Sequence, residues 1–160
     1  MRRFLAISIP VFAIGFVCGA AFWYLFSPLF FDDVVSEELA GADTLTEVAV
    51  GTFRDADRAH SGTGTATIFA RPDGSAVLRF TAFEVTNGPD LEVWLSSHPD
   101  PQSSSDVSDG EWLSLGQLKG NVGDQNYDIP MGTDLSQYGS VVIWCEQFGV
   151  LFSPAALGAS

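Results

Sequence analysis

Cysteine and histidine are scarce in this chain, which contains two residues of each type. Cys18 lies in an uncharged N-terminal segment, so Cys145 has no disulfide partner in the rest of the chain. A c-type haem is excluded because there is no Cys-x-x-Cys-His motif, and a structural zinc site would lack ligands. Hydrolase chemistry is disfavoured because no Gly-x-Ser-x-Gly elbow accompanies the histidines.

Basic residues are also few, since 7 Lys and Arg stand against 20 Asp and Glu and give a formal net charge of -13. All of the acidic residues lie downstream of Phe31. Nucleic acids and anionic membrane surfaces both require a basic face, so this acidic part excludes them as binding partners. Two explanations of the acidity stay open: a solvated surface suited to high salt, or the capture of a cation or a basic partner.

Charge is absent from residues 4–31, and about 20 apolar residues suffice to cross the hydrocarbon core of a membrane as a helix. Arg2 and Arg3 precede this segment, whereas Asp32 and Asp33 follow it. Such an asymmetry points the N-terminus into the cytoplasm. We therefore expect residues 1–31 to be a single-pass anchor in the plasma membrane and the C-terminal domain to be extracytoplasmic, either periplasmic or at the cell surface.

Two alternatives to this anchor are weaker. A cleaved signal peptide usually has a short apolar stretch followed by a small-x-small cleavage site, but here Ala20-Ala21 runs into Phe22-Trp23-Tyr24. A lipoprotein cleaved before Cys18 would need small residues upstream, where the chain has Phe16-Val17. Cys18 is then expected to be a small apolar residue within the membrane.

The remaining chain is long enough for one domain with a core. Residues 32–46 are acidic and poor in large apolar residues, and we interpret them as a juxtamembrane linker. From residue 47 to residue 160, short runs rich in Val, Ile, Thr and Phe alternate with Gly, Pro, Asn and Asp. This pattern predicts β-strands. The segment His98–Gly110, rich in Pro and Ser, is expected to be an exposed, mobile loop.

The predicted fold class is all-β, because no segment between the strands has helical periodicity. We expect an antiparallel β-sandwich or a small barrel of about eight strands. These strands are Val48–Phe53, Thr63–Ala70, Ala76–Phe83, Asp90–Leu95, Glu111–Leu118, Gln125–Ile129, Ser140–Cys145 and Val150–Phe152. Turns are predicted at Arg71-Pro72-Asp73-Gly74, at Asn87-Gly88-Pro89-Asp90 and at Gln147-Phe148-Gly149.

An ordered set of segments resembles the DM13 domain family. The segments are Gly51-Thr52-Phe53, His60 to Ala66, Leu78 to Leu91, Leu115 to Tyr127 and Val142-Ile143-Trp144-Cys145, and together they cover most of Glu47–Leu157. One membrane helix followed by one such domain is also similar to bacterial and archaeal members. The resemblance implies electron transfer or another redox role at an extracytoplasmic site, centred on the cysteine that matches Cys145.

Cys145 is the main candidate site residue. In a regular strand it shares a face with Val141 and Ile143 and points away from Glu146, which would bury the thiol. Buried free cysteines are usually inert core residues, so a structural role stays open beside a redox role. His60 is an auxiliary candidate, because Asp55 and Asp57 precede it and a carboxylate could orient its ring or raise its pKa.

The sequence contains possible ligands for a copper site and for a calcium site, but neither set has the expected spacing. A His₂Cys copper site with an axial Met could use His60, His98, Cys145 and Met131, but no His or Met follows Cys145 within a few residues. Calcium could use Asp90, Asp124 and Asp128, but no EF-hand pattern is present, and Asp90 and Asp124 are better interpreted as turn-fixing residues. We predict no metal site and can name no cofactor.

Two functions from different classes remain. The first is a membrane-anchored redox domain in which Cys145 reacts with a partner protein that the sequence does not identify. The second is a non-catalytic, membrane-tethered β-module for binding or assembly, with Cys145 buried as a structural residue. The exposure and reactivity of Cys145 distinguish them.

Overall fold

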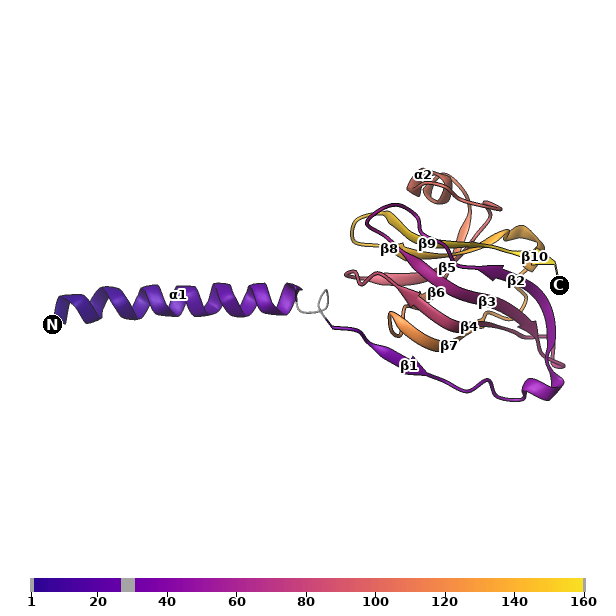
Figure 1. Ribbon diagram of the computed structural model, residues 1–160, viewed down its shortest axis with the longest axis horizontal. Coiled ribbons are helices and arrows are strands. Elements are labelled where there is room, and N and C mark those ends of the chain that lie inside the picture. The colour runs from indigo at the N-terminus through magenta and orange to yellow at the C-terminus, as the bar shows by residue number, and fades with distance from the viewer. Residues whose placement is uncertain (1, 27–30, 160) are drawn as a thin grey trace. The chain divides into compact units, whose positions relative to one another are not determined.

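The computed structural model describes the backbone of residues 2–26 and 31–159, and the side chains of residues 9–23 and 31–159. The chain divides into two compact units, residues 1–31 and 32–160. Figure 1 shows a helix in the first unit and stacked β-sheets in the second. The fold is therefore mostly β, with one N-terminal helix.

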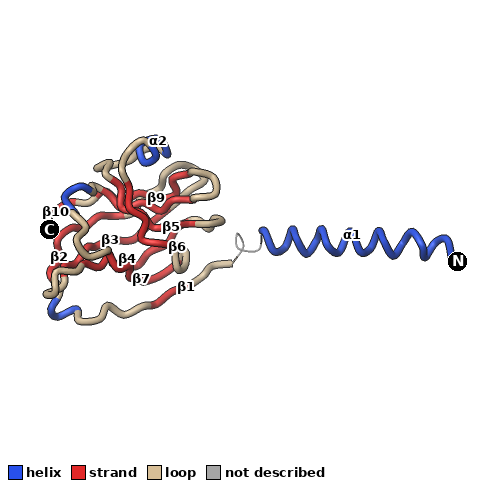
Figure 2. Tube along the Cα trace, turned by 180° about the vertical axis from the view of Figure 1, so that it is seen from behind, coloured by secondary structure: helices blue, strands red, loops and turns tan. Residues whose placement is uncertain are grey.

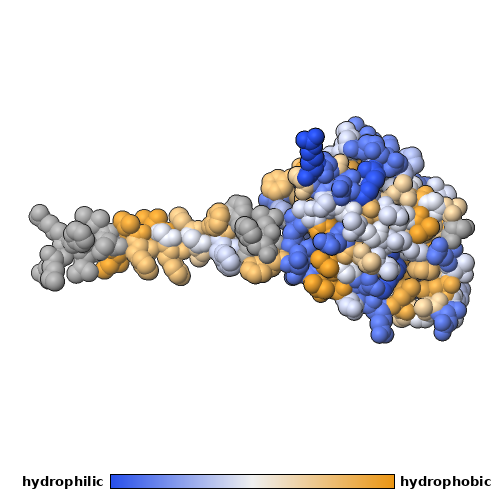
Figure 3. Space-filling model, viewed as in Figure 1, coloured by the Kyte–Doolittle hydropathy of each residue, from blue (hydrophilic) through white to orange (hydrophobic). Residues whose placement is uncertain are grey.

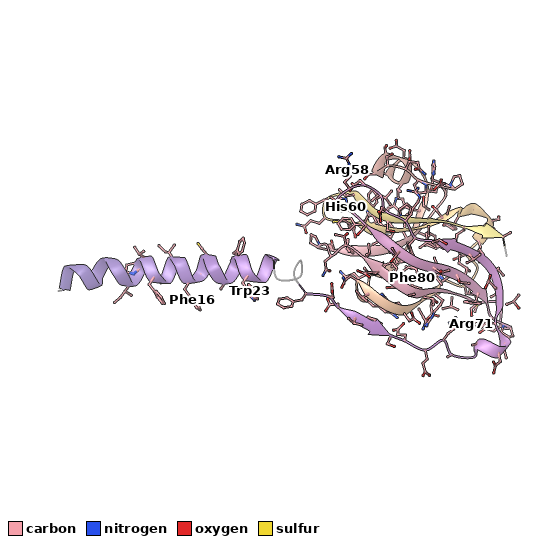
Figure 4. The ribbon with its side chains drawn as sticks, viewed as in Figure 1. Phe16, Trp23, Arg58, His60, Arg71 and Phe80 are labelled. Atoms are coloured by element: carbon pink, nitrogen blue, oxygen red, sulfur yellow. The ribbon has the colours of Figure 1, made fainter. Side chains whose placement is uncertain are left out.

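The N-terminal unit is the helix α1 (Arg2–Phe26), which contains Pro10. Its described side chains, including Phe16 and Trp23, are exposed and largely apolar (Figures 3 and 4). In the part of the chain that the structure describes, no helix is both long and apolar enough to cross a membrane. The predicted helix is confirmed, but the predicted transmembrane span is not supported.

The larger sheet of the second unit has six strands in the order β1-β7-β4-β3-β2-β10. Its strands are β1 (Val34–Ser36), β2 (Thr46–Thr52), β3 (Gly62–Ala70), β4 (Ala76–Val85), β7 (Val122–Ile129) and β10 (Gly158–Ala159). Neighbouring strands are antiparallel except for β1 and β7, which are parallel.

The smaller sheet has four antiparallel strands in the order β6-β5-β8-β9. Its strands are β5 (Leu91–Ser96), β6 (Trp112–Gln117), β8 (Ser140–Cys145) and β9 (Val150–Ala156). All eight predicted strands are present within a few residues of their expected bounds. Two separate sheets make a sandwich, so the barrel alternative is wrong for the described residues.

The core fills the space between the two sheets. Phe80 on β4 lies at its centre, with ring centroids 4.8 Å from both Phe53 and Phe83 and 5.3 Å from Tyr127 (Figure 4). The smaller sheet contributes inward-facing aliphatic side chains: Leu91, Val93, Leu95, Val141 and Ile143. Alternate residues of each strand form this layer because successive side chains of a strand point to opposite faces.

The outer face of the smaller sheet is also covered. A second cluster there contains Trp94, Val142, Trp144, Leu151 and Val107. Val107 belongs to the short helix α2 (Ser104–Ser108), which lies beside β9 (Figure 2). Because both of its faces are covered, every residue of β8 is buried.

The helix α2 corrects the prediction of an irregular loop over His98–Gly110. Ser103 and Asp106 form a capping box, in which the Asp106 carboxylate accepts a hydrogen bond from the Ser103 N–H at 2.9 Å. This pairing satisfies N–H groups at the helix start. One apolar side chain, Val107, then fixes the helix on the sheet.

The predicted linker, residues 32–46, belongs to the same compact unit as the β domain. Val34, Val35 and Ser36 pair with β7, and the chain then follows the edge of the larger sheet to β2 (Figure 1). The Glu37 carboxylate accepts hydrogen bonds from Lys119 Nζ at 2.8 Å and from the Asn126 N–H at 2.7 Å. These contacts explain why the acidic segment is ordered along the sheet.

The predicted turns are present. The N–H of Gly74 donates to the carbonyl of Arg71 at 3.0 Å, with a positive φ of 85° at Gly74. Gly149 has a φ of 62°, and its N–H donates to the carbonyl of Cys145 at 2.9 Å. Glycine adopts such φ angles without the steric cost that a Cβ imposes.

Candidate functional site

The candidate site lies where β8 ends. Cys145 is the last residue of β8, and its side chain has no exposed surface. It belongs to the inner cluster together with Val141 and Ile143, as the period of a regular strand predicts. Across the sheet it faces Leu91 on β5 and Val150 on β9. The predicted burial of the thiol is confirmed.

The thiol has one hydrogen-bond partner, which sequence reasoning missed. The Cys145 S–H donates to the carbonyl of Pro89 at 3.0 Å. Pro89 lies in the predicted turn at residues 87–90, where Asp90 has a positive φ of 53°. The carbonyl of Asp90 in turn accepts the N–H of Glu146 at 3.0 Å. The turn is therefore hydrogen-bonded both to the thiol of Cys145 and to the N–H of the following residue, Glu146.

A bulge in β9 places the ring of Phe152 against the same turn. Ile143 pairs with Ser153 and Trp144 pairs with Leu151, so Phe152 is an extra residue on β9. A Cβ added to Gly88 would lie 2.6 Å from Cε1 of the Phe152 ring. A side chain at this position would therefore have to displace the Phe152 ring or the turn.

His60 also packs against the Phe152 ring. The two ring centroids are 4.2 Å apart, and the Nδ1 of His60 is 2.9 Å from Oδ2 of Asp57. The hydrogen bond from the histidine ring, together with the backbone N–H of Ala59, holds the pKa of the Asp57 carboxyl below its ordinary value. The predicted orienting carboxylate is thus Asp57.

The loop of His60 is attached to the segment that leads into the turn. The N–H of Ser61 donates to Oγ1 of Thr86 at 2.9 Å, and the N–H of Thr86 donates to the carbonyl of Ser61 at 2.9 Å. Both candidate residues therefore lie at the same end of the sandwich. Figure 4 labels His60 at this end and Arg71 at the opposite end.

Comparison with family models gives a match to the electron-transfer DM13 family over residues 52–157. The match covers nearly all of the β-sandwich and includes His60, the turn at residues 87–90 and Cys145. The chain belongs to the DM13 family. Comparisons with curated proteins and with solved structures gave no match.

The copper hypothesis fails on the arrangement of its ligands in the DM13 domain. The carbonyl of His98 accepts a hydrogen bond from Ser140 Oγ at 2.7 Å, and Ser140 is at the other end of β8 from Cys145. Five residues of extended strand separate these ends by about 17 Å. Met131 has 75% of its surface exposed. Among the described residues, no group of three or more His, Cys, Asp or Glu side chains could hold a metal ion.

The three aspartates considered for calcium have other partners. Asp124 pairs with Arg79 at 2.6 Å and also accepts the N–H of Ala82 at 2.9 Å. Asp128 pairs with Arg71 at 2.7 Å. Asp90 forms part of the turn over Cys145, and its Oδ1 accepts a hydrogen bond from Gln117 Nε2 at 3.4 Å. Their carboxylates therefore fix strands and turns of the DM13 domain.

The chemistry available at the site depends on access to sulfur. The thiolate is the reactive form of cysteine, and it forms most readily where solvent or a cation can reach it. In this arrangement the S–H group instead donates to a neutral carbonyl beneath a turn. The buried thiol of Cys145 is therefore out of reach of a partner in this arrangement.

Proposed function

We propose that this DM13 domain transfers electrons through the thiol of Cys145. Membership of an electron-transfer family supports a redox role, and the matched residues include Cys145. The observation that carries the proposal is the hydrogen bond from the buried thiol to Pro89. It fixes the sulfur beneath a turn that can open locally without separation of the sheets.

The proposed reaction is exchange with a disulfide of a partner protein. Once the turn has opened, Cys145 loses its proton to water, and its thiolate attacks one sulfur of the partner's disulfide. The new sulfur–sulfur bond forms as the partner's bond breaks, and the released thiolate takes up a proton. Cys145 is oxidised, and the released partner sulfur is reduced. A partner is required because a single thiol cannot form an internal disulfide.

His60 is proposed as a positioning residue for this step. Its ring packs on Phe152, which supports the turn through Gly88. Asp57 holds the ring in that orientation. Replacement of His60 by alanine should therefore increase the rate at which the thiol is labelled, while the secondary structure stays unchanged.

The test uses glutathione disulfide as the oxidant and is made in the Cys18→Ser chain, because Cys18 is itself an exposed thiol. The Cys18→Ser chain should form one mixed disulfide per chain, whereas the chain that carries Cys145→Ser in addition should form none and keep its β-sheet spectrum. An inert thiol in the folded protein would contradict the proposal, especially if Cys145→Ser lost stability and Cys145→Ala did not. A buried hydroxyl without a good partner costs about 1–3 kcal/mol.

The alternative is a non-catalytic β-module for binding or assembly. The complete burial of Cys145 favours it, because buried cysteines are usually inert. This function predicts labelling only in denaturant, at a rate set by global unfolding. The redox proposal instead predicts labelling through local opening, whose rate does not follow the unfolding rate.

The extracytoplasmic location remains a prediction. Its support is the uncharged segment at residues 4–31 and the position of Arg2 and Arg3 before it. Protease added to intact spheroplasts should digest the β domain or release it. Complete protection of the domain in sealed cells would contradict this location.

A further inference from the structure

Three tryptophans form a stack on the outer face of the smaller sheet, which the redox proposal for Cys145 does not use. The rings of Trp94 on β5 and Trp112 on β6 are stacked, with centroids 3.9 Å apart and an interplanar angle of 9°. Trp144 on β8 lies on the other side of Trp94 at 5.1 Å and 26°. Trp94 is therefore the middle ring of three, contributed by three neighbouring strands.

The stack runs from the surface into the covered face. Trp112 has 46% of its surface exposed, whereas Trp94 and Trp144 are buried. A molecule in solvent can reach Trp112 directly, and Trp112 contacts Trp94 over the ring face. Face-to-face contact of this kind brings the π-systems of the two indoles together.

The indole N–H of Trp94 points at a carboxylate. Its Nε1 donates to Oε2 of Glu92 at 2.7 Å, and the hydroxyl of Ser114 donates to the same oxygen at 2.7 Å. Glu92 and Trp94 share a face of β5 because they are two residues apart. A short hydrogen bond to an ionised acceptor is of the stronger, charge-assisted class.

The hydrogen bonds around Glu92 favour its ionised form, which has an oxygen free of a proton. Burial raises the pKa of Glu92, but the hydrogen bonds from Trp94 and Ser114 outweigh this effect and lower it. The hydrogen bond to Glu92, followed by the negative charge of Glu92, raises the pKa of Glu146, which is exposed. Of the two carboxyl groups, Glu92 therefore keeps its charge to the lower pH.

We propose that Trp94 is a one-electron redox site, with Glu92 as its proton acceptor and Trp112 as its contact with the oxidant. The reaction is balanced. Trp94 gives one electron through Trp112 to a cationic one-electron acceptor, and the indole proton moves from Nε1 to Glu92 Oε2. The products are a neutral indolyl radical, a protonated Glu92 and the reduced acceptor. The acceptor is expected to be cationic because the chain has a formal net charge of -13.

This site goes beyond the proposed function, because it involves neither Cys145 nor the turn above it. Trp144 and Cys145 are consecutive residues of β8 whose side chains lie in different clusters, on opposite faces of the smaller sheet. The indole site can therefore exist whether or not the thiol is reactive. A test with the thiol removed distinguishes the two proposals.

The test generates a ruthenium tris-bipyridyl oxidant by a laser flash in the presence of the full chain and records the indole radical by transient absorption. The variants are Glu92→Gln and, as a matched control, Trp23→Phe, which removes the indole of the N-terminal helix. Glutamine keeps a carbonyl oxygen for the Trp94 N–H but cannot take its proton. The radical cation should then persist at least about tenfold longer than in the unchanged chain, since a positioned base contributes at least this much.

Trp112→Phe should reduce the radical yield severalfold, whereas Trp23→Phe should leave the lifetime of the radical cation unchanged. An unchanged lifetime in Glu92→Gln would overturn the proposal, as would an unchanged yield in Trp112→Phe. Glu92→Gln keeps the shape of the side chain, and Trp112→Phe keeps an aromatic ring. Circular dichroism verifies the fold of both variants. The Glu92 effect should persist in Cys145→Ala. Its disappearance there would mean that the thiol, rather than Glu92, controls the lifetime.

Discussion

The two faces of β8 hold their oxidisable side chains in different surroundings. On the inner face, Cys145 donates its hydrogen bond to the neutral carbonyl of Pro89. On the outer face, Trp144 stacks on Trp94, whose N–H is bound to the carboxylate of Glu92. A carboxylate can accept a proton when its partner is oxidised, but a backbone carbonyl cannot. The outer face is therefore equipped for coupled loss of an electron and a proton, and the inner face is not.

The largest expected effect tests the inner face as a packed layer. Phe80→Ala removes the ring that contacts Phe53, Phe83 and Tyr127. It should lower the free energy of unfolding by about 3–5 kcal/mol, measured by urea denaturation. Phe148→Ala is the control, because Phe148 is exposed and its loss should change stability by less than about 0.5 kcal/mol. Equal effects of the two substitutions would contradict the arrangement of the core.

The next largest effect concerns the turn at residues 87–90, which lies over the thiol of Cys145. Gly88→Ala places a methyl group against the Phe152 ring and should destabilise the domain by about 1–3 kcal/mol. It should also increase the rate of Cys145 labelling, because the turn is forced away from the ring. The control is Ala59→Gly, which changes an exposed loop residue beside His60. Gly74→Ala would be a poor control, because the positive φ of Gly74 would add strain of its own. Labelling that stays as slow in Gly88→Ala as in Ala59→Gly would show that the turn does not control access.

A smaller effect concerns pH and the segment that precedes β2. The hydrogen bond from Lys119 lowers the pKa of Glu37, with the N–H of Asn126 acting in the same direction against burial. A lowered folded-state pKa stabilises the fold above the unfolded value of 4.5, and this stability is lost as pH falls through the folded value. Glu37→Gln should therefore cost about 0.2–1 kcal/mol at pH 7 and nothing at low pH. The measurement is the difference in urea midpoint between the original chain and Glu37→Gln across about pH 3–7, the range in which glutamate carboxyl groups titrate. This difference should shrink as the pH falls.

The smallest effect is a gradual response to salt. Seven basic residues against 20 acidic ones leave repulsion among exposed carboxylates, which salt screens. Thermal unfolding midpoints should rise modestly between about 0.01 M and 1 M salt, a range over which the screening length falls from roughly 30 Å to 3 Å. A midpoint independent of salt would mean that the acidic surface does not repel itself appreciably.

Strands of the DM13 domain could be predicted from sequence because their alternating or continuous apolar patterns are local. The strand β1 could not, since three residues in an acidic segment acquire their structure by pairing with β7. The helix α2 had a local signal in the capping residues Ser103 and Asp106, but the surrounding prolines and serines favoured a loop. Short elements such as these are determined by tertiary contacts more than by their own sequence.

The contacts of the candidate sites likewise include some that a local pattern predicted and some that depend on distant residues. Burial of Cys145 followed from the period of β8, whereas its partner Pro89 is distant in sequence and had no pattern of its own. The carboxylate near His60 was predictable because Asp57 is three residues away. The indole stack joins residues from three strands, and its one local signal is the spacing of two between Glu92 and Trp94. Such long-range contacts depend on strand register, which the sequence of one strand does not determine.

The edges of the two sheets have a consequence for contacts between copies of the domain. The larger sheet ends in β1 and β10, strands of three and two residues. On β9, the N–H of Leu151 donates to Ser104 Oγ at 3.0 Å, and the carbonyl of Pro154 accepts the N–H of Arg54 at 3.1 Å. Long, unpaired edges recruit other chains into intermolecular sheets, and these three edges are either short or already occupied. Of the four sheet edges, β6 (Trp112–Gln117) is therefore the one at which the sheet of a second copy would meet the least obstruction.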